Sequence, residues 1–227
     1  MSDLIKEQVV EMLRMQDELN IFANGKGWKE GITDKGRDIN WERCIRQELS
    51  EYIDSFNWAH WKNINGEDDI ANAKMELVDV WHFLMSKFIR DNTFKPLMIV
   101  GAIKEAYRVE YSHMIREVMV QNAEDLSRLV TYHALKDSVV AFFRLCNATD
   151  LSFEELRETY VLKNSLNVFR RNNGYREGTY VKIWHGKEDN YYIQKYREDG
   201  KEITFDAITV YLTERYLGVV DRNKTSR

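Results

Sequence analysis

Four carboxylates stand in two pairs whose spacing matches the turn of an α-helix. Glu48 and Glu51 are three residues apart, and so are Glu76 and Asp79. Residues at this spacing share one face of a helix, so each pair presents two carboxylates side by side. Glu48 also falls within an apolar stripe, where a carboxylate without a cation is costly. The four groups include no histidine or thiolate, so the cation that suits them is a hard one, Mg²⁺ or, as a substitute, Mn²⁺.

Other interpretations of the acidic pairs are open at this point. Such pairs are common on ordinary helices, where they form solvated acidic faces. A ferritin-like di-iron site is disfavoured, because two of its helices carry a Glu-x-x-His motif. Here Asp79 stands in the place of that histidine, and His82 comes three residues too late.

A second set of polar side chains suits the phosphates of a nucleotide. Lys163, Asn167 and Arg170 follow one another at i, i+4 and i+7, which places them on one helix face. Lys and Arg on one face neutralise a polyphosphate, although an ordinary basic helix face has the same pattern. Tyr175 and Lys182 follow in residues 172–192, a stretch with three glycines, five aromatic residues and no helical stripe. We predict this stretch to be a long functional loop.

The remaining candidates suit a nucleobase. Gln16 and Asn20 extend an apolar row four residues apart. A side-chain amide both donates and accepts hydrogen bonds, which matches the edge of a pyrimidine, although buried amides also cap or bridge helices. His60, Trp61 and His82 lie close to the acidic pairs in sequence and could stack on a base. As single residues they are more often aromatic residues of a hydrophobic core.

Helices must position these side chains, and apolar residues at helical spacing predict where they run. Only one proline, Pro96, interrupts the chain. The short connection after the second predicted helix makes the second and third antiparallel neighbours, which would bring the four carboxylates to one point. The predicted fold is all-α, a multi-helix bundle around a carboxylate-lined metal site, in a single domain over residues 1–227. The predicted helices cover residues 3–22, 40–56, 70–90, 97–119, 123–147, 152–171 (with a capping box at Ser152) and 203–218.

Composition excludes several classes of function. The chain has 227 residues, 44% hydrophobic and 31% charged, which is a globular balance. Its 33 basic and 37 acidic residues leave a net charge of −4, so no nucleic-acid partner is expected. No apolar run approaches the ~20 residues of a membrane span, so no membrane partner is expected either. Cys44 and Cys146 lie in helical patterns, as expected of reduced cytosolic thiols. The N-terminus lacks a signal-peptide core. These features predict a cytoplasmic protein.

Taken together, these residues resemble the dimeric all-α dUTPases, a branch of the all-α nucleotide pyrophosphatase superfamily that includes the MazG-like enzymes. The segment from Lys163 to Asn190 is the most specific match, because MazG-like relatives share mainly the acidic pairs. Gln47 departs from the pattern, since the wider superfamily often carries a further glutamate there. The matching segments are Met15 to Asn20, Glu48 to Ser55, Trp58 to Lys62, Glu76 to Phe83 and Lys163 to Asn190.

The resemblance implies a dUTP diphosphatase. It would hydrolyse dUTP, and also dUDP, to dUMP with release of pyrophosphate or phosphate, by attack of a Mg²⁺-activated water. The implied partner is a small-molecule nucleotide, and the implied assembly is a homodimer.

The resemblance also implies roles for individual residues. Glu48, Glu51, Glu76 and Asp79 would hold the metal, with Glu51 and Glu48 catalytic and Glu51 orienting or deprotonating the water. Lys163, Arg170, Tyr175 and Lys182 would bind phosphates, Gln16, Asn20 and Asn167 would read uracil, and His60, Trp61 and His82 would contact the base.

Two alternative functions remain. A MazG-like nucleoside triphosphate pyrophosphatase of other specificity would keep the carboxylates but would need neither the Gln16/Asn20 pair nor the stretch after Gly174. A non-catalytic helical interaction protein would simply turn its acidic helices to solvent.

Overall fold

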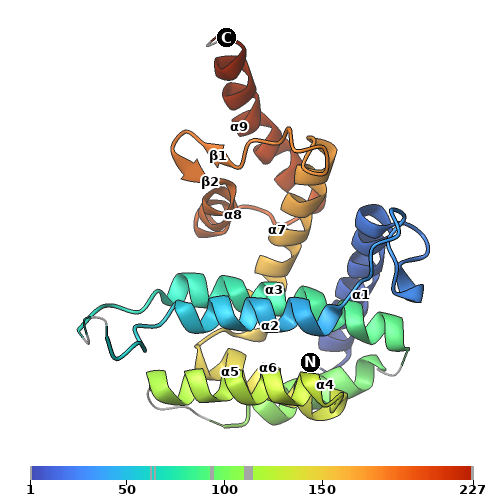
Figure 1. The fold of residues 1–227 in the computed structure, drawn as a ribbon, viewed down its shortest axis with the longest axis vertical. Coiled ribbons are helices and arrows are strands. Elements are labelled where there is room, and N and C mark those ends of the chain that lie inside the picture. Colours follow the sequence, from blue (N-terminus) through green and yellow to red (C-terminus); the bar gives the residue numbers. More distant parts are fainter. Residues whose placement is uncertain (1, 62, 64, 93–94, 110–114, 226–227) are drawn as a thin grey trace. The chain divides into compact units, whose positions relative to one another are not determined.

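The computed structural model describes residues 2–61, 63, 65–92, 95–109 and 115–225 (Figure 1). Helix accounts for 71% of the chain, which confirms the predicted all-α, multi-helix fold. Within the described ranges, β-structure is confined to one two-stranded hairpin and one isolated bridge. The chain divides into two compact units, unit 1 (residues 1–156) and unit 2 (residues 157–227), and each is described by itself.

Unit 1 is a bundle of helices built around the pair formed by α2 and α3. These two helices lie side by side and run in opposite directions, as predicted (Figure 1). Helix α1 packs on α3 and α4, while α5 and α6 form a second antiparallel pair. The elements of unit 1 are α1 (Ser2–Asn24), the 3-10 helix η1 (Trp28–Glu30), α2 (Trp41–Asp54), α3 (Ile70–Asp91), α4 (Pro96–Ala106), α5 (Arg116–Thr131), α6 (Leu135–Ala148) and the start of α7 (Phe153–Asn172).

Capping side chains set where α2 and α3 begin. Asn40 accepts a hydrogen bond from the backbone N–H of Arg43 at the start of α2 (2.8 Å), and Asp69 accepts one from Asn72 at the start of α3 (2.9 Å). Asp69 also donates its backbone N–H to the carbonyl of Ser55, the C-cap of α2 (2.8 Å). The end of α2 is therefore tied to the beginning of α3, which holds the two carboxylate-bearing helices in register.

The core of unit 1 is aromatic at its centre. Trp81 of α3 is fully buried and stacks on Phe142 of α6, with ring centroids 5.2 Å apart and an interplanar angle of 11°. On α2, most of the predicted apolar stripe is buried, including Ile45 and Leu49. Burial of such side chains is the main favourable term in folding, at roughly 1.5–3 kcal/mol for each.

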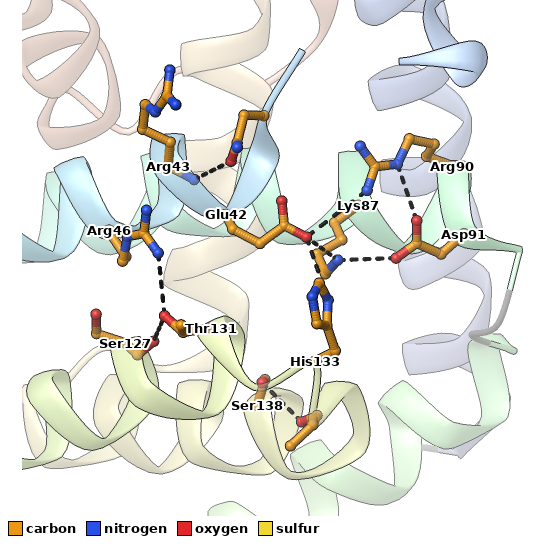
Figure 2. Close-up of polar contacts among 12 residues, drawn as sticks. Glu42, Arg43, Arg46, Lys87, Arg90, Asp91, Ser127, Thr131, His133 and Ser138 are labelled. Carbon is orange, nitrogen blue, oxygen red and sulfur yellow. Dashed lines mark hydrogen bonds and ion pairs between the residues drawn. The ribbon is translucent and has the colours of Figure 1, made fainter. Parts of the chain in front are cut away.

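An ion cluster around the buried Lys87 links three parts of unit 1 (Figure 2). Lys87 of α3 is 1% exposed and donates to Glu42 of α2 and to Asp91, with Nζ 3.1 Å from Oδ2 of Asp91. Arg90 Nε also donates to Asp91 (3.0 Å), and His133, after α5, places Nδ1 3.6 Å from Glu42. Burial tends to raise the pKa of Glu42, but the hydrogen bond from Lys87 and the charges of Lys87 and Arg90 outweigh it and lower that pKa.

Unit 2 gathers aromatic side chains around a short hairpin. Trp184 in β1 is fully buried, and its ring contacts those of Phe169, Tyr180 and Tyr216 at centroid distances of 5.8, 6.3 and 5.2 Å. The elements of unit 2 are the rest of α7, β1 (Ile183–Trp184), β2 (Lys187–Glu188), α8 (Asp189–Glu198) and α9 (Phe205–Thr225).

Two predicted helices are wrong in their bounds. Instead of one helix over 97–119 and another over 123–147, α4 ends at Ala106, α5 spans Arg116–Thr131 and α6 starts at Leu135; residues 110–114 lie outside the described part. The break between α5 and α6 is at His133, whose φ is +57°. Both helices turn an apolar face to the same core, so the apolar pattern continues across the turn and conceals it.

The predicted loop over 172–192 is also wrong in part. It contains the β1–β2 hairpin, whose two-residue turn His185–Gly186 has positive φ at both positions, and the first turn of α8. Strands of two residues are too short to give a period in the sequence.

Candidate functional site

Three carboxylates from two helices of unit 1 converge. Glu48 comes from α2, and Glu76 and Asp79 come from α3, one turn apart. One carboxylate oxygen from each lies within 4.8 Å of the others, and all three side chains are half-buried or more. We call these residues the carboxylate trio.

Glu51 is the fourth predicted ligand, and the structure places it differently. It is exposed, and its Oε1 accepts a hydrogen bond from Nε2 of Gln47 at 3.0 Å. Within the described residues, the group that could share one ion is the trio alone. The predicted convergence therefore holds for three of the four side chains.

The donor set of the trio fits a hard divalent cation. Carboxylate oxygens are the ligands preferred by Mg²⁺ and Mn²⁺, and soft metals favour thiolate or imidazole ligands. The trio also carries like charges at short range, a repulsion that a cation relieves.

The predicted uracil-reading amides lie in a buried network between α1 and α3. Gln16 and Asn20 are 3% and 4% exposed, and each donates to Oγ of Ser86, at 3.0 and 2.9 Å. His82, also buried, is bonded through Nδ1 to Oε1 of Gln16 at 2.7 Å. The amides therefore bridge two helices and hold one another in fixed orientations. Ser86, which joins them, was not singled out from the sequence, because a serine one turn after His82 carries no signal of its own.

His60 and Trp61 lie in the turn after α2, on the surface of unit 1. Trp61 is 67% exposed, so it is not a core residue, and its ring contacts those of His60 (4.8 Å) and Trp58 (5.7 Å). Lys62, the end of that matching segment, lies outside the described residues. His82 does not belong to this aromatic cluster, because it is part of the buried amide network.

The predicted phosphate-binding residues of α7 lie in unit 2. Lys163 is 4% exposed, and its Nζ donates to Oδ1 of Asn190 at 3.2 Å. Arg170 forms a bidentate pair with Asp189, with Nε 2.8 Å from Oδ2 and Nη2 2.7 Å from Oδ1. Asn167, between the two cations, accepts from Nη1 of Arg170 at 3.2 Å. The helical spacing thus brings Asn167 and Arg170 into direct contact, as predicted for one face.

Asp189, like Ser86, was not singled out from the sequence. Its carboxylate is fully buried and also accepts a hydrogen bond from the Tyr180 hydroxyl at 2.7 Å. Burial tends to lower the pKa of the Arg170 guanidinium, but the hydrogen bonds and charge of Asp189 outweigh it and raise that pKa. Burial, together with the bond to Asp189, raises the pKa of Tyr180 as well. Arg170 is consequently held as a cation.

Tyr175 and Lys182 are more exposed. The guanidinium carbon of Arg170 lies 6.0 Å from the ring centroid of Tyr175, which is 56% exposed. Lys182 pairs with Glu188 across the hairpin at 3.4 Å.

The fold and the acidic site define a class: an all-α protein that gathers carboxylates suited to a hard divalent cation. A family model described as dUTPase matches residues 8–175, well over half of the chain. The chain therefore belongs to the dUTPase family. A search of curated proteins found no match. Among the described helices, none is both long and apolar enough to cross a membrane.

The matched range includes the carboxylate trio, the amide network and both α7 cations, Lys163 and Arg170. It ends before Lys182 and Asp189.

Proposed function

We propose that this protein hydrolyses dUTP, and also dUDP, to dUMP in a Mg²⁺-dependent reaction that releases pyrophosphate or phosphate. Membership of the dUTPase family supports the substrate. The observation that carries the metal requirement is the trio, with oxygens of Glu48, Glu76 and Asp79 within 4.8 Å of one another.

The trio holds Mg²⁺, for which Mn²⁺ is the expected substitute. When bound, Mg²⁺ supplies Lewis-acid stabilisation of charge on the phosphates and lowers the pKa of water. Glu51 orients or deprotonates the attacking water, with Glu48 as the neighbouring carboxylate. Because Glu51 is exposed and bonded through one oxygen to Gln47, its second oxygen can accept a proton from solvent.

Lys163 and Arg170 bind the phosphates, with Tyr175 and Lys182 as further contacts. Phosphoryl transfer depends mainly on positioning and on charge neutralisation, which Lys and Arg supply. If Lys163 and Arg170 bind the α- and β-phosphates, dUDP and dUTP gain the same binding energy from them. Their kcat/KM values should then differ by less than about tenfold, or ~1.4 kcal/mol.

Gln16, Asn20 and Asn167 read uracil, and His60, Trp61 and His82 contact the base. The amides of Gln16 and Asn20 are fixed by Ser86, so their donors and acceptors cannot freely rearrange for another base. Cytosine reverses donor and acceptor at two ring positions and would leave them unpaired. A site of this kind discriminates against a base with the wrong hydrogen-bonding edge by a factor of ~10⁴ or more in kcat/KM.

The deciding experiment is to incubate the purified protein with each deoxynucleoside triphosphate, and with dUDP, in the presence and absence of Mg²⁺. We expect turnover of dUTP and dUDP only, and only with Mg²⁺. Asp79→Asn and Glu51→Gln should each lose at least about 100-fold in kcat. Asp137→Asn, an exposed carboxylate in the first turn of α6, is the matched control and should keep full activity.

Other outcomes favour the alternatives. Equal turnover of dCTP and dUTP supports a MazG-like pyrophosphatase of other specificity. The absence of any turnover or Mg²⁺ binding supports a helical interaction protein. Reaction in ¹⁸O-labelled water locates the attack, because attack at the β-phosphorus puts the label into pyrophosphate and leaves dUMP unlabelled.

The assembly we propose is a homodimer. Apolar side chains that are exposed on α1 and α4, such as Leu4 (57%) and Leu97 (64%), are consistent with a covered surface. Sedimentation equilibrium of the full chain tests this, and a monomer at all concentrations contradicts it. The single domain over residues 1–227 stays a prediction.

A further inference from the structure

Asp189 holds the guanidinium of Arg170 in one plane. The two make a pair of parallel N–H···O bonds, with Nε donating to Oδ2 at 2.8 Å and Nη2 donating to Oδ1 at 2.7 Å. Asp189 is fully buried, and the side chain of Arg170 is 12% exposed. The Tyr180 hydroxyl donates to Oδ2 as well, at 2.7 Å, and so fixes the carboxylate itself. A bidentate pair of this kind sets orientation as well as charge.

The pair with Asp189 leaves one edge of the Arg170 guanidinium available to a ligand. A guanidinium has five N–H groups. Nε and one N–H of Nη2 are taken by Asp189, the second N–H of Nη2 by Asn190 (3.3 Å), and one N–H of Nη1 by Asn167 (3.2 Å). The remaining N–H of Nη1 has no acceptor among the residues that the structure describes. An anion that approaches Arg170 is therefore met through Nη1.

The first turn of α8 also links the two cations of α7. Oδ1 of Asn190 accepts from Nζ of Lys163 at 3.2 Å and from Nη2 of Arg170 at 3.3 Å. A backbone hydrogen bond holds this turn in position. The N–H of Asp189 donates to the carbonyl of Lys182, the residue immediately before the hairpin, at 3.0 Å. The hairpin of unit 2 thus brings an acidic residue under the cations of α7.

We propose that Asp189 is a positioning residue for phosphate binding, which fixes the Arg170 guanidinium so that its Nη1 edge receives the anion. The inference rests on the proposed function for the assignment of Arg170 to phosphate. Asp189 itself touches no substrate and acts only through Arg170. Without the carboxylate, the guanidinium keeps its charge but loses its fixed plane.

The test is a double-mutant cycle read by calorimetric binding of inorganic pyrophosphate in Mg²⁺, which needs no turnover. We expect Asp189→Asn to weaken pyrophosphate binding about tenfold or more in the wild-type background. In the Arg170→Gln background the same change should alter binding less than about twofold, because the residue through which it acts is gone. Asp199→Asn, an exposed carboxylate that pairs with Lys195 just after α8, is the matched control and should bind as wild type.

Three results would overturn the inference. One is wild-type affinity in Asp189→Asn, the second is an equal loss with and without Arg170, and the third is failure of the wild-type protein to bind pyrophosphate. Asp189→Glu keeps the charge and should recover part of the affinity, which a purely structural role does not require.

A second variant keeps the test decisive if Asp189→Asn does not fold. Tyr180→Phe removes one neutral donor to the same carboxylate and leaves the Arg170–Asp189 pair in place. We expect a loss of about two- to fivefold in pyrophosphate affinity that disappears in the Arg170→Gln background. An unchanged affinity in Tyr180→Phe, in that case, rejects the inference.

The outcome is separable from that of the proposed function. If wild-type protein cleaves dUTP while Asp189→Asn has unchanged KM and kcat, the function stands and the inference falls. If wild-type protein binds pyrophosphate with the expected cycle but cleaves no nucleotide, the proposed function falls and the positioning role of Asp189 stands.

Discussion

Removing one carboxylate of the trio should abolish most of the stabilisation that Mg²⁺ confers. The perturbation is Asp79→Asn, which keeps the size of the side chain and removes one charge. In the apo protein, two like charges within 4.8 Å of each other repel by at least about 0.9 kcal/mol in bulk water and by more where solvent is excluded. Binding of a divalent cation converts that repulsion into attraction, so it should stabilise the folded state.

The size of the effect follows from simple electrostatics and linkage. At a Mg²⁺ concentration of about 100 times Kd, stabilisation is about 2.7 kcal/mol. One charged oxygen about 2.1 Å from Mg²⁺ attracts it by roughly 4 kcal/mol at the dielectric constant of water. If about half is offset by desolvation, the lost carboxylate weakens binding by ~2 kcal/mol, or about 30-fold. The same Mg²⁺ then stands near 3 Kd, where stabilisation is only about 0.8 kcal/mol.

The assay is thermal unfolding followed by circular dichroism, with and without Mg²⁺. For a domain of this size 1 kcal/mol corresponds to about 2–4 °C, so Mg²⁺ should raise the wild-type Tm by about 5–11 °C. In Asp79→Asn the rise should be about 2–3 °C. Asp137→Asn should respond as wild type, since this exposed side chain belongs to α6.

Glu51→Gln gives the sharpest contrast. Because Glu51 lies outside the trio, this variant should keep the full Mg²⁺-induced rise in Tm while losing turnover. An undiminished Mg²⁺ response in Asp79→Asn would refute the assignment of the trio. Loss of the response in Glu51→Gln would show that four carboxylates, not three, bind the ion.

Three further predictions concern the rest of the molecule. Because Glu42 has a lowered pKa in the folded state, its contribution to stability is present above the unfolded value of ~4.3 and is lost as the pH falls. Lys87→Met should therefore flatten the pH dependence of unfolding by urea below about pH 5, and an unchanged dependence would contradict the role of the cluster. Burial raises the pKa of the Cys44 and Cys146 thiols, most strongly for the fully buried Cys146. A thiol reagent at neutral pH should therefore modify Cys44 first, and equal rates of modification of the two cysteines in the native protein would count against this. Ser152 accepts from the backbone N–H of Glu155 at 3.1 Å, so Ser152→Ala should lower the free energy of unfolding by about 1 kcal/mol in urea titrations, and no change would mean that this cap is not needed.

The amino-acid sequence by itself determined what depends on near neighbours along the chain. Helical periodicity and caps predict α1, α2, α3 and α7 closely, because hydrophobic spacing and the side chain that caps a helix act within one or two turns. The same local spacing places Asn167 beside Arg170. The all-α class follows from the sum of such segments, and so does the presence of acidic pairs on α2 and α3.

The tertiary structure alone decided which members of each set meet. Glu48 and Glu51 share a helix face, but they differ by about 60° around the axis at 3.6 residues per turn. Burial of Ile45 and Leu49 sets the rotation of α2 against α3, and that rotation turns Glu48 to the trio and leaves Glu51 in solvent.

Partners that are distant in sequence could not be read from local patterns. Ser86 joins Gln16 and Asn20 across 70 and 66 residues, and Asp189 meets Arg170 only because a hairpin too short to give a period lies between them. The turn at His133 was concealed for a related reason, since the helices on either side of it bury their apolar faces in one core. A periodic pattern records that a face is buried, and the packing of the chain determines what buries it.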